Sequence, residues 1–199
     1  MISCSVPKST LPADKKPISV VFLGNSLTYA NDLPGLVEAL ALENGMPMRT
    51  QMIAKPNYAL VDHLVEGQIQ SALKNKFDYL VIQQGPSSQE EGRQMLLDAS
   101  QQLKMLCDPY GTKLVVYMVW PAHTNYSTFD GVIKNYTDAA VKTNALLIPA
   151  GKKWKEHIDQ TKDLSYYDSD LFHPSPKGSQ MVAQLIYEAI KKDQPDHIK

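Results

Sequence analysis

Ile18-Ser19-Val20-Val21-Phe22-Leu23-Gly24-Asn25-Ser26-Leu27-Thr28 is the stretch of sequence that decides the fold. Residues 17–23 form a nearly continuous apolar run with β-branched side chains, which predicts a strand buried in a parallel sheet. The glycine and the polar residues that follow end this strand, so a helix is expected directly behind them. Ser26 is therefore expected at a turn from a strand to a helix.

Strands and helices alternate along the rest of the chain. Short apolar runs predict further strands over residues 48–53, 77–82, 114–119 and 145–148. Helical spacing of apolar residues predicts helices over 33–44, 59–74, 88–108, 128–143, 151–160 and 177–191. This alternation predicts an α/β fold, a three-layer α/β/α sandwich around a five-stranded parallel sheet in the flavodoxin-like order 2-1-3-4-5.

Details of the helices are predicted from side chains near their ends and along one face. Ser88 and Glu91 form a capping-box pattern at the start of the 88–108 helix. On the apolar face of the same helix, five residues are expected to point toward the core: Met95, Leu96, Ala99, Leu103 and Leu106.

A second informative stretch, Asp170-Leu171-Phe172-His173-Pro174, precedes the last predicted helix. In an open parallel sheet, ligands bind at the carboxyl ends of the strands, beside the point where the strand order reverses. Ser26 follows strand one at that point, and the segment 165–176 should return Asp170 and His173 to the same edge. The predicted fold therefore brings a serine, an imidazole and a carboxylate together.

These three side chains are the components of a serine-nucleophile hydrolase. A serine hydroxyl is a poor nucleophile until a base takes its proton, and His173 is the candidate base because imidazole is the side chain best suited to this role near neutral pH. Asp170 would orient the ring and stabilise its protonated form. Each motif alone has a plainer interpretation, because Ser26 could be a helix cap and the Asp-x-x-His pattern could arise by chance. Their joint occurrence in one α/β pattern favours the catalytic interpretation.

The two stretches resemble the SGNH (GDSL-type) hydrolase superfamily of esterases and lipases. Gly24-Asn25-Ser26-Leu27-Thr28 is similar to the first block of that family, with Asn25 where aspartate is common. Asp170 and His173 match its final Asp-x-x-His block. The resemblance implies the fold predicted above, catalysis by Ser26, His173 and Asp170, and no metal or cofactor.

The two middle blocks diverge from the family pattern, and both concern the oxyanion hole. The family has a glycine after strand two, whereas residues 54–60 contain none, and Asn57 is our choice for that position. Ser87 stands where the family has an asparagine donor, and the amide of Gln84 or Gln83 could replace that donor. The expected donors are therefore Ser26, Asn57, Gln84 and Ser87.

The substrate pocket is expected to include Asn25, Tyr58 and His123, because each lies in a loop at the predicted site edge. An aromatic rim able to stack on sugar or aryl groups is a further hypothesis. Its residues would be Tyr29, Tyr58, Trp120, Tyr126, Tyr166, Tyr167 and Phe172. The remaining histidines are expected to have lesser roles, with His63 facing solvent or a neighbouring loop and His157 and His197 on the surface.

Composition limits the classes of partner. The 199 residues suit one domain, and the net charge of −1 gives no basic surface of the kind that binds nucleic acid. No apolar run reaches the roughly 20 residues that a transmembrane helix needs. Residues 1–16 are interpreted as a flexible tether and 17–199 as a single domain. Cys4 lies in a pattern like the end of a bacterial lipoprotein signal, so a lipid anchor and an extracytoplasmic location are expected if the true start lies upstream, and a cytoplasmic location otherwise.

Three functions fit the sequence to different degrees. The leading hypothesis is a serine ester hydrolase that acts through an acyl-enzyme on a small acyl ester, such as an acetylated carbohydrate. The alternative is a non-catalytic protein that binds a ligand on the same fold, as the divergent middle blocks would allow. Phosphate binding after strand one is disfavoured, because that loop lacks a glycine-rich run and a lysine.

Overall fold

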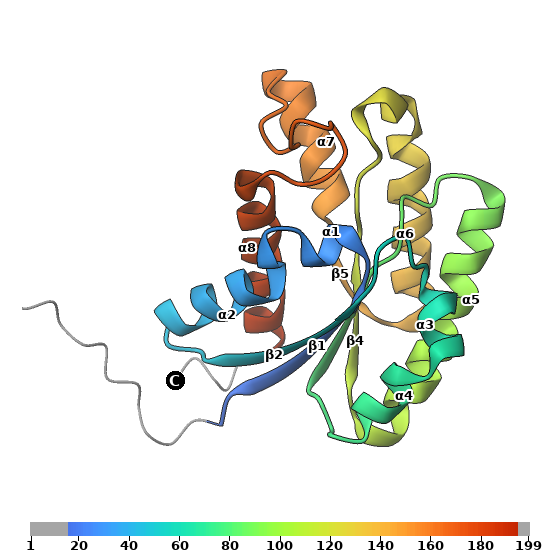
Figure 1. Cartoon of the computed structure of the whole chain (residues 1–199), viewed down its shortest axis with the longest axis vertical. Coiled ribbons are helices and arrows are strands. Elements are labelled where there is room, and N and C mark those ends of the chain that lie inside the picture. The colour runs from blue at the N-terminus through green and yellow to red at the C-terminus, as the bar shows by residue number, and fades with distance from the viewer. Residues whose placement is uncertain (1–15, 195–199) are drawn as a thin grey trace, which may run out of the picture.

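The computed structural model describes residues 16–194, and in it five parallel strands form one sheet in the order β2-β1-β3-β4-β5 (Figure 1). The strands are β1 (Ile18–Gly24), β2 (Met48–Ala54), β3 (Tyr79–Ile82), β4 (Lys113–Tyr117) and β5 (Leu146–Ile148). β1 pairs with β2 over its whole length, from Ile18 opposite Met48 to Gly24 opposite Ala54. The predicted fold class and strand order are confirmed.

Helices cover both faces of the sheet (Figure 1). On one side lie α2 (Leu33–Glu43) and α8 (Pro176–Asp193), and on the other lie α3 (Leu60–Glu66), α4 (Gln68–Leu73), α5 (Glu90–Cys107) and α6 (Phe129–Thr143). The short helix α1 (Ser26–Tyr29) follows β1 directly, and α7 (Ala150–Thr161) follows β5 and contacts both α6 and α8. Three 3₁₀ turns complete the described elements: Ala30–Asp32, Asp108–Tyr110 and His123–Thr128.

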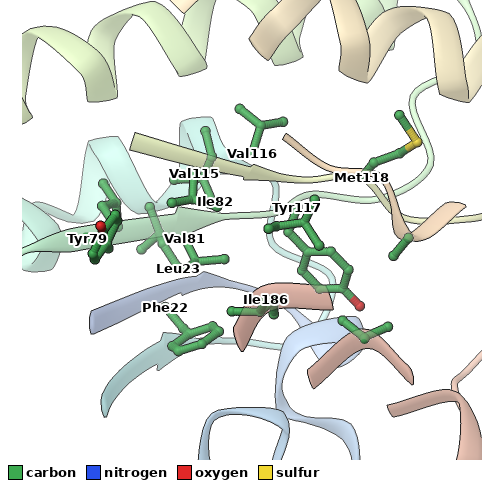
Figure 2. Packing of buried hydrophobic residues seen from close by; sticks show 14 of the residues in the cluster. Phe22, Leu23, Tyr79, Val81, Ile82, Val115, Val116, Tyr117, Met118 and Ile186 are labelled. Atoms are coloured by element: carbon green, nitrogen blue, oxygen red, sulfur yellow. The ribbon is translucent and has the colours of Figure 1, made fainter. Parts of the chain in front are cut away.

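The core lies between the sheet and its two helical layers. Figure 2 shows Phe22 of β1, Val81 of β3 and Tyr117 of β4 in the same packed cluster as Ile186 of α8. These side chains are almost completely removed from solvent. Burial of both sheet faces explains why β1 and β3 are apolar along nearly their whole length rather than alternating.

Three predicted details of the helices are wrong. The helix predicted over 59–74 is divided into α3 and α4 at Gly67, whose φ of 80° is left-handed and cannot continue a helix. The capping box of Ser88 and Glu91 is not formed, because α5 begins at Glu90 with Gln89 as its cap residue. Met95 does not point into the core, since 38% of it is exposed.

The structure describes one of the two cysteines. Cys107 is buried in α5, and burial raises the pKa of its thiol to about 12. Cys4 and nearly all of the proposed tether lie outside the described residues, so the lipid anchor stays a prediction. No helix within residues 16–194 is long and apolar enough to cross a membrane.

Candidate active site

Residues 24–26 form the turn that joins β1 to α1, and we call it the nucleophile turn because it carries the candidate nucleophile Ser26. Asn25 is the cap residue of α1, and its Oδ1 accepts a hydrogen bond from the backbone N–H of Leu27 at 3.1 Å. Gly24 precedes it in a crowded position, where a Cβ atom would lie 2.3 Å from Thr28 Oγ1 and 2.5 Å from Gln83 Oε1. A side chain at position 24 would displace Thr28 and Gln83, so glycine suits this position. The turn places Ser26 as the first helical residue, at the carboxyl edge of the sheet.

Ser26, His173 and Asp170 form a continuous hydrogen-bonded series. Ser26 Oγ lies 2.9 Å from His173 Nε2, and His173 Nδ1 lies 2.5 Å from Asp170 Oδ2. An ionised carboxylate can only accept a hydrogen bond. The imidazole proton is therefore on Nδ1, and Nε2 is free to accept the serine proton. The hydrogen bond from His173 also holds the pKa of Asp170 below its usual value, so that the carboxyl stays ionised.

The second oxygen of Asp170 fixes the turn that carries the imidazole. Asp170 Oδ1 accepts hydrogen bonds from the backbone N–H groups of Phe172 and His173, each at 2.9 Å. Leu171, which lies between Asp170 and Phe172, has a φ of 55°, an uncommon conformation for a residue with a branched side chain. Both carboxylate oxygens are therefore engaged with the same short segment, and this limits the rotation of Asp170 relative to His173.

Asn25 and Gln83 form a buried amide pair behind the nucleophile turn. Gln83 Oε1 accepts from the backbone N–H of Asn25 at 3.1 Å and from Thr28 Oγ1 at 2.8 Å, while Gln83 Nε2 donates to Asn25 Oδ1 at 3.0 Å. Asn25 Nδ2 donates to the carbonyl of Tyr58 at 3.0 Å. An aspartate could not make this last bond, so the asparagine links the nucleophile turn to the loop after β2.

A cleft of about 410 Å³ opens beside Ser26. Its wall comes from the nucleophile turn, the loops after β2 and β3, the start of α5 and the segment before His173. The lining residues are Asn25, Ser26, Leu27, Asn57, Tyr58, Ala59, Gln84, Gly85, Pro86, Ser87, Ser88, Gln89, Gly92, Met95 and Phe172. Within the described part of the chain, no acidic, basic or imidazole side chain is among them.

The residues expected to supply oxyanion donors all line this cleft. Ser26 is at the start of α1, where backbone N–H groups lack intrahelical partners. Asn57 has a φ of 61°, the left-handed conformation that glycine adopts most easily, which is consistent with its place opposite the family's glycine. The amide of Gln84 already donates to Ser87 Oγ at 2.8 Å, and Ser87 Oγ donates to the Gly85 carbonyl at 3.1 Å.

The structure places two of the three predicted pocket residues in the cleft. Asn25 and Tyr58 line the cleft, whereas His123 is not among its lining residues and packs against the rings of Tyr126 and Tyr167 instead. The aromatic rim is also only partly formed. Tyr58 and Phe172 reach the cleft, but Trp120 and Tyr167 are buried in the core. Trp120 stacks there on Trp154, with 3.4 Å between the ring centroids.

His63 was expected to face solvent or a loop, and the structure buries it under the nucleophile turn. Only 1% of the residue is exposed, and its Nε2 lies 2.8 Å from the Gly24 carbonyl. The signal was present in the sequence, because His63 follows Leu60 by three residues and therefore shares its buried face of α3. Met95 was predicted on the apolar face of the 88–108 helix, and Phe172 was predicted only as part of an aromatic rim. The structure places both in the wall of the cleft.

A metal centre is not suggested by the described residues. No group of three or more histidine, cysteine, aspartate or glutamate side chains in residues 16–194 is arranged to hold a metal ion.

Comparison with known proteins places the fold. No family model matches the chain, and no curated protein matches it. A proposed SGNH hydrolase from Slackia heliotrinireducens is 22% identical with a TM-score of 0.77, covering 88% of this chain and 100% of its own. A lipase/acylhydrolase from Enterococcus faecalis is 17% identical with a TM-score of 0.72, covering 88% and 96%. A catalytic mutant of an acetylxylan esterase from Geobacillus stearothermophilus is 14% identical with a TM-score of 0.63, covering 87% and 92%. The chain therefore has the fold of the SGNH hydrolases.

Proposed function

We propose that the protein is a serine ester hydrolase with Ser26 as nucleophile, His173 as general base and acid, and Asp170 as the residue that orients the imidazole. The observation that carries this proposal is the series of contacts from Ser26 Oγ to His173 Nε2, at 2.9 Å, and from His173 Nδ1 to Asp170 Oδ2, at 2.5 Å. If Ser26 served only as a helix cap, it would need no hydrogen bond to an imidazole that is itself paired with a carboxylate. The similarity of the fold to esterase and lipase structures supports the same activity.

The reaction follows from this geometry in two halves. Ser26 Oγ attacks the ester carbonyl while His173 Nε2 takes the serine proton, giving a tetrahedral intermediate and an imidazolium that faces Asp170. The intermediate collapses, the alcohol leaves with the proton from His173, and the acyl group stays on Ser26. Water then attacks the acyl-enzyme with His173 again as base, and the acid and free Ser26 are released.

The negative oxygen of the intermediate needs hydrogen-bond donors. The backbone N–H of Ser26 is the first candidate, and the loop at Asn57 is the second. Gln84 could act as a third donor if its amide exchanged Ser87 Oγ for the substrate oxygen. Removal of one such donor typically slows an enzyme by about 10²–10³-fold.

A small acyl ester of a neutral alcohol is the substrate class we favour, with an acetylated carbohydrate as one example. The cleft is lined by amides, hydroxyls and the rings of Tyr58 and Phe172, and these groups can bind sugar hydroxyls and stack on sugar faces. The similarity to an acetylxylan esterase supports this choice.

The test is hydrolysis of p-nitrophenyl acetate by the wild type, Ser26→Ala and His173→Ala, with Ser88→Ala as the matched control. Ser88 lines the same cleft, and the side-chain hydrogen bonds of His173 within the described residues go to Ser26 and Asp170 rather than to Ser88. We expect both triad variants to lose at least about 10³-fold in kcat and the control to keep its activity. Full activity in Ser26→Ala would overturn the proposal. An inactive wild type that still gains thermal stability on binding an acetylated sugar would favour the binding-protein alternative.

A further inference from the structure

The loop that carries Asp170 and His173 is attached to the segment that follows β4. This loop, residues 162–175, joins α7 to α8 above the sheet in Figure 1. Three hydrogen bonds connect it to residues 120–123. Trp120 Nε1 donates to the Phe172 carbonyl at 3.0 Å, the backbone N–H of His123 donates to the Leu171 carbonyl at 2.9 Å, and Tyr167 Oη donates to the Pro121 carbonyl at 2.8 Å.

The bond from Trp120 acts on the peptide group directly before the imidazole. The Phe172 carbonyl and the His173 N–H belong to one planar peptide unit. Trp120 holds the carbonyl end of that unit, and Asp170 Oδ1 accepts from its N–H end at 2.9 Å. With both ends held, the peptide plane has little freedom to rotate, and the direction in which His173 leaves the backbone is fixed.

Trp120 is itself rigid. It is completely buried, and its ring lies 3.4 Å from that of Trp154 with 11° between the ring planes. Its indole N–H is a donor set in the core at a defined place, so the carbonyl that it holds cannot shift without leaving a buried donor unsatisfied.

Trp154 is the natural contrast. It is equally buried and forms the other half of the same stacked pair, but it makes no hydrogen bond to the backbone of residues 170–173, and its ring packs against Tyr166 and Tyr167 instead. The two tryptophans therefore share a packing role, but among the described residues only Trp120 donates a hydrogen bond to the peptide group directly before His173.

We propose that Trp120 is a positioning residue that holds the His173 imidazole in line between Ser26 and Asp170 through the Phe172 carbonyl. The inference rests on the proposed hydrolase function, because it assigns Trp120 a role in aligning the catalytic base. It predicts that the N–H group of Trp120, rather than the bulk of its ring, matters for turnover.

The test compares Trp120→Phe with Trp154→Phe. Each variant replaces one fully buried ring of the stacked pair by a smaller one, but only Trp120→Phe removes the hydrogen bond to the Phe172 carbonyl. We expect kcat of Trp120→Phe to fall by roughly 10- to 100-fold with KM little changed, because a small displacement of a catalytic group has that cost. Trp154→Phe should keep kcat close to that of the wild type. Equal losses of kcat in the two variants, or an unchanged kcat in Trp120→Phe, would overturn the proposal.

A spectroscopic readout makes the result independent of turnover. The proton between His173 Nδ1 and Asp170 should give a strongly downfield proton resonance that disappears in His173→Ala. We expect this resonance to broaden or shift in Trp120→Phe and to persist in Trp154→Phe. If the wild type hydrolyses no ester but shows this difference, the proposed function fails while the positioning role stands. A resonance that is unchanged in Trp120→Phe contradicts the positioning role.

If Trp120→Phe does not fold, 3-benzothienylalanine at position 120 keeps the ring shape and removes only the N–H donor. The same loss of kcat is expected from this replacement. A fully active protein with the sulfur analogue would show that the ring, not the hydrogen bond, is what the site requires.

Discussion

The imidazole of His63 is a buried base whose two nitrogens have different environments. Its Nε2 faces the Gly24 carbonyl at 2.8 Å, and because a carbonyl only accepts, Nε2 must carry the proton of the neutral ring. Its Nδ1 is buried without a hydrogen-bond partner among the described residues. A second proton on Nδ1 would therefore be unsatisfied, and burial lowers the pKa of His63 below its ordinary value of 6.5.

This lowered pKa predicts a loss of stability in acid. Below about pH 6.5 the unfolded chain binds a proton at position 63 that the folded protein does not, so the free energy of unfolding should decrease as the pH falls from about 7 to 5. His63→Gln keeps a donor for the Gly24 carbonyl but does not titrate. Urea unfolding at several pH values should show a weaker pH dependence in this variant than in the wild type. Parallel pH profiles would mean that His63 is not the group responsible.

At the scale of elements, the start of α5 is both a helix terminus and a wall of the cleft. Gly92 lies in the first turn of α5 and lines the cleft, and a Cβ atom there would be 3.4 Å from Ser87, an ordinary contact. A methyl group therefore fits, but a larger side chain at this position must enter the cleft or displace Ser87.

If the proposed function holds, Gly92→Leu is accordingly expected to shorten the acyl chains that the protein accepts. We expect kcat/KM for p-nitrophenyl butanoate and hexanoate to fall by about tenfold or more relative to the acetate, since a few methylenes in a pocket are worth that much. Gly92→Ala is the control, and it should keep the wild-type preference and fold at least as stably, because alanine favours a helix over glycine by about 1 kcal/mol. An unchanged acyl preference in Gly92→Leu would place the acyl group outside this part of the cleft.

The same region shows why element boundaries were less predictable than the elements themselves. The pattern of Ser88 and Glu91 predicts a capping box, but residues 85–89 are used to line the cleft, and Ser87 is held there by Gln84. Met95 has the helical spacing of a core residue and instead faces the cleft. Periodicity identifies an apolar face, but it cannot distinguish a core from an apolar wall of a binding site.

At the scale of the whole molecule, the order of the strands and the proximity of Ser26 to His173 could be predicted from the sequence. The apolar run before Gly24 and the alternation of strands and helices suffice for a parallel sheet, and the rule for its carboxyl edge brings Ser26 toward His173. The buried amide pair of Asn25 and Gln83 and the hydrogen bond of Trp120 could not be predicted in the same way. They depend on side-chain directions across three loops, which local patterns do not determine.

The candidate triad depends on the complete fold, because Ser26 and His173 are 147 residues apart in sequence and meet only when the sheet and α8 are in place. If the protein unfolds in one cooperative step, esterase activity and far-UV circular dichroism should be lost at the same urea concentration. The bonds from residues 120–123 to the loop of His173 favour this result, since they join the loop to the core. Activity lost at clearly lower urea than the dichroism would show instead that residues 162–175 open before the sheet unfolds. In that case Trp120→Phe, which removes the hydrogen bond to the Phe172 carbonyl, should widen the separation between the two transitions.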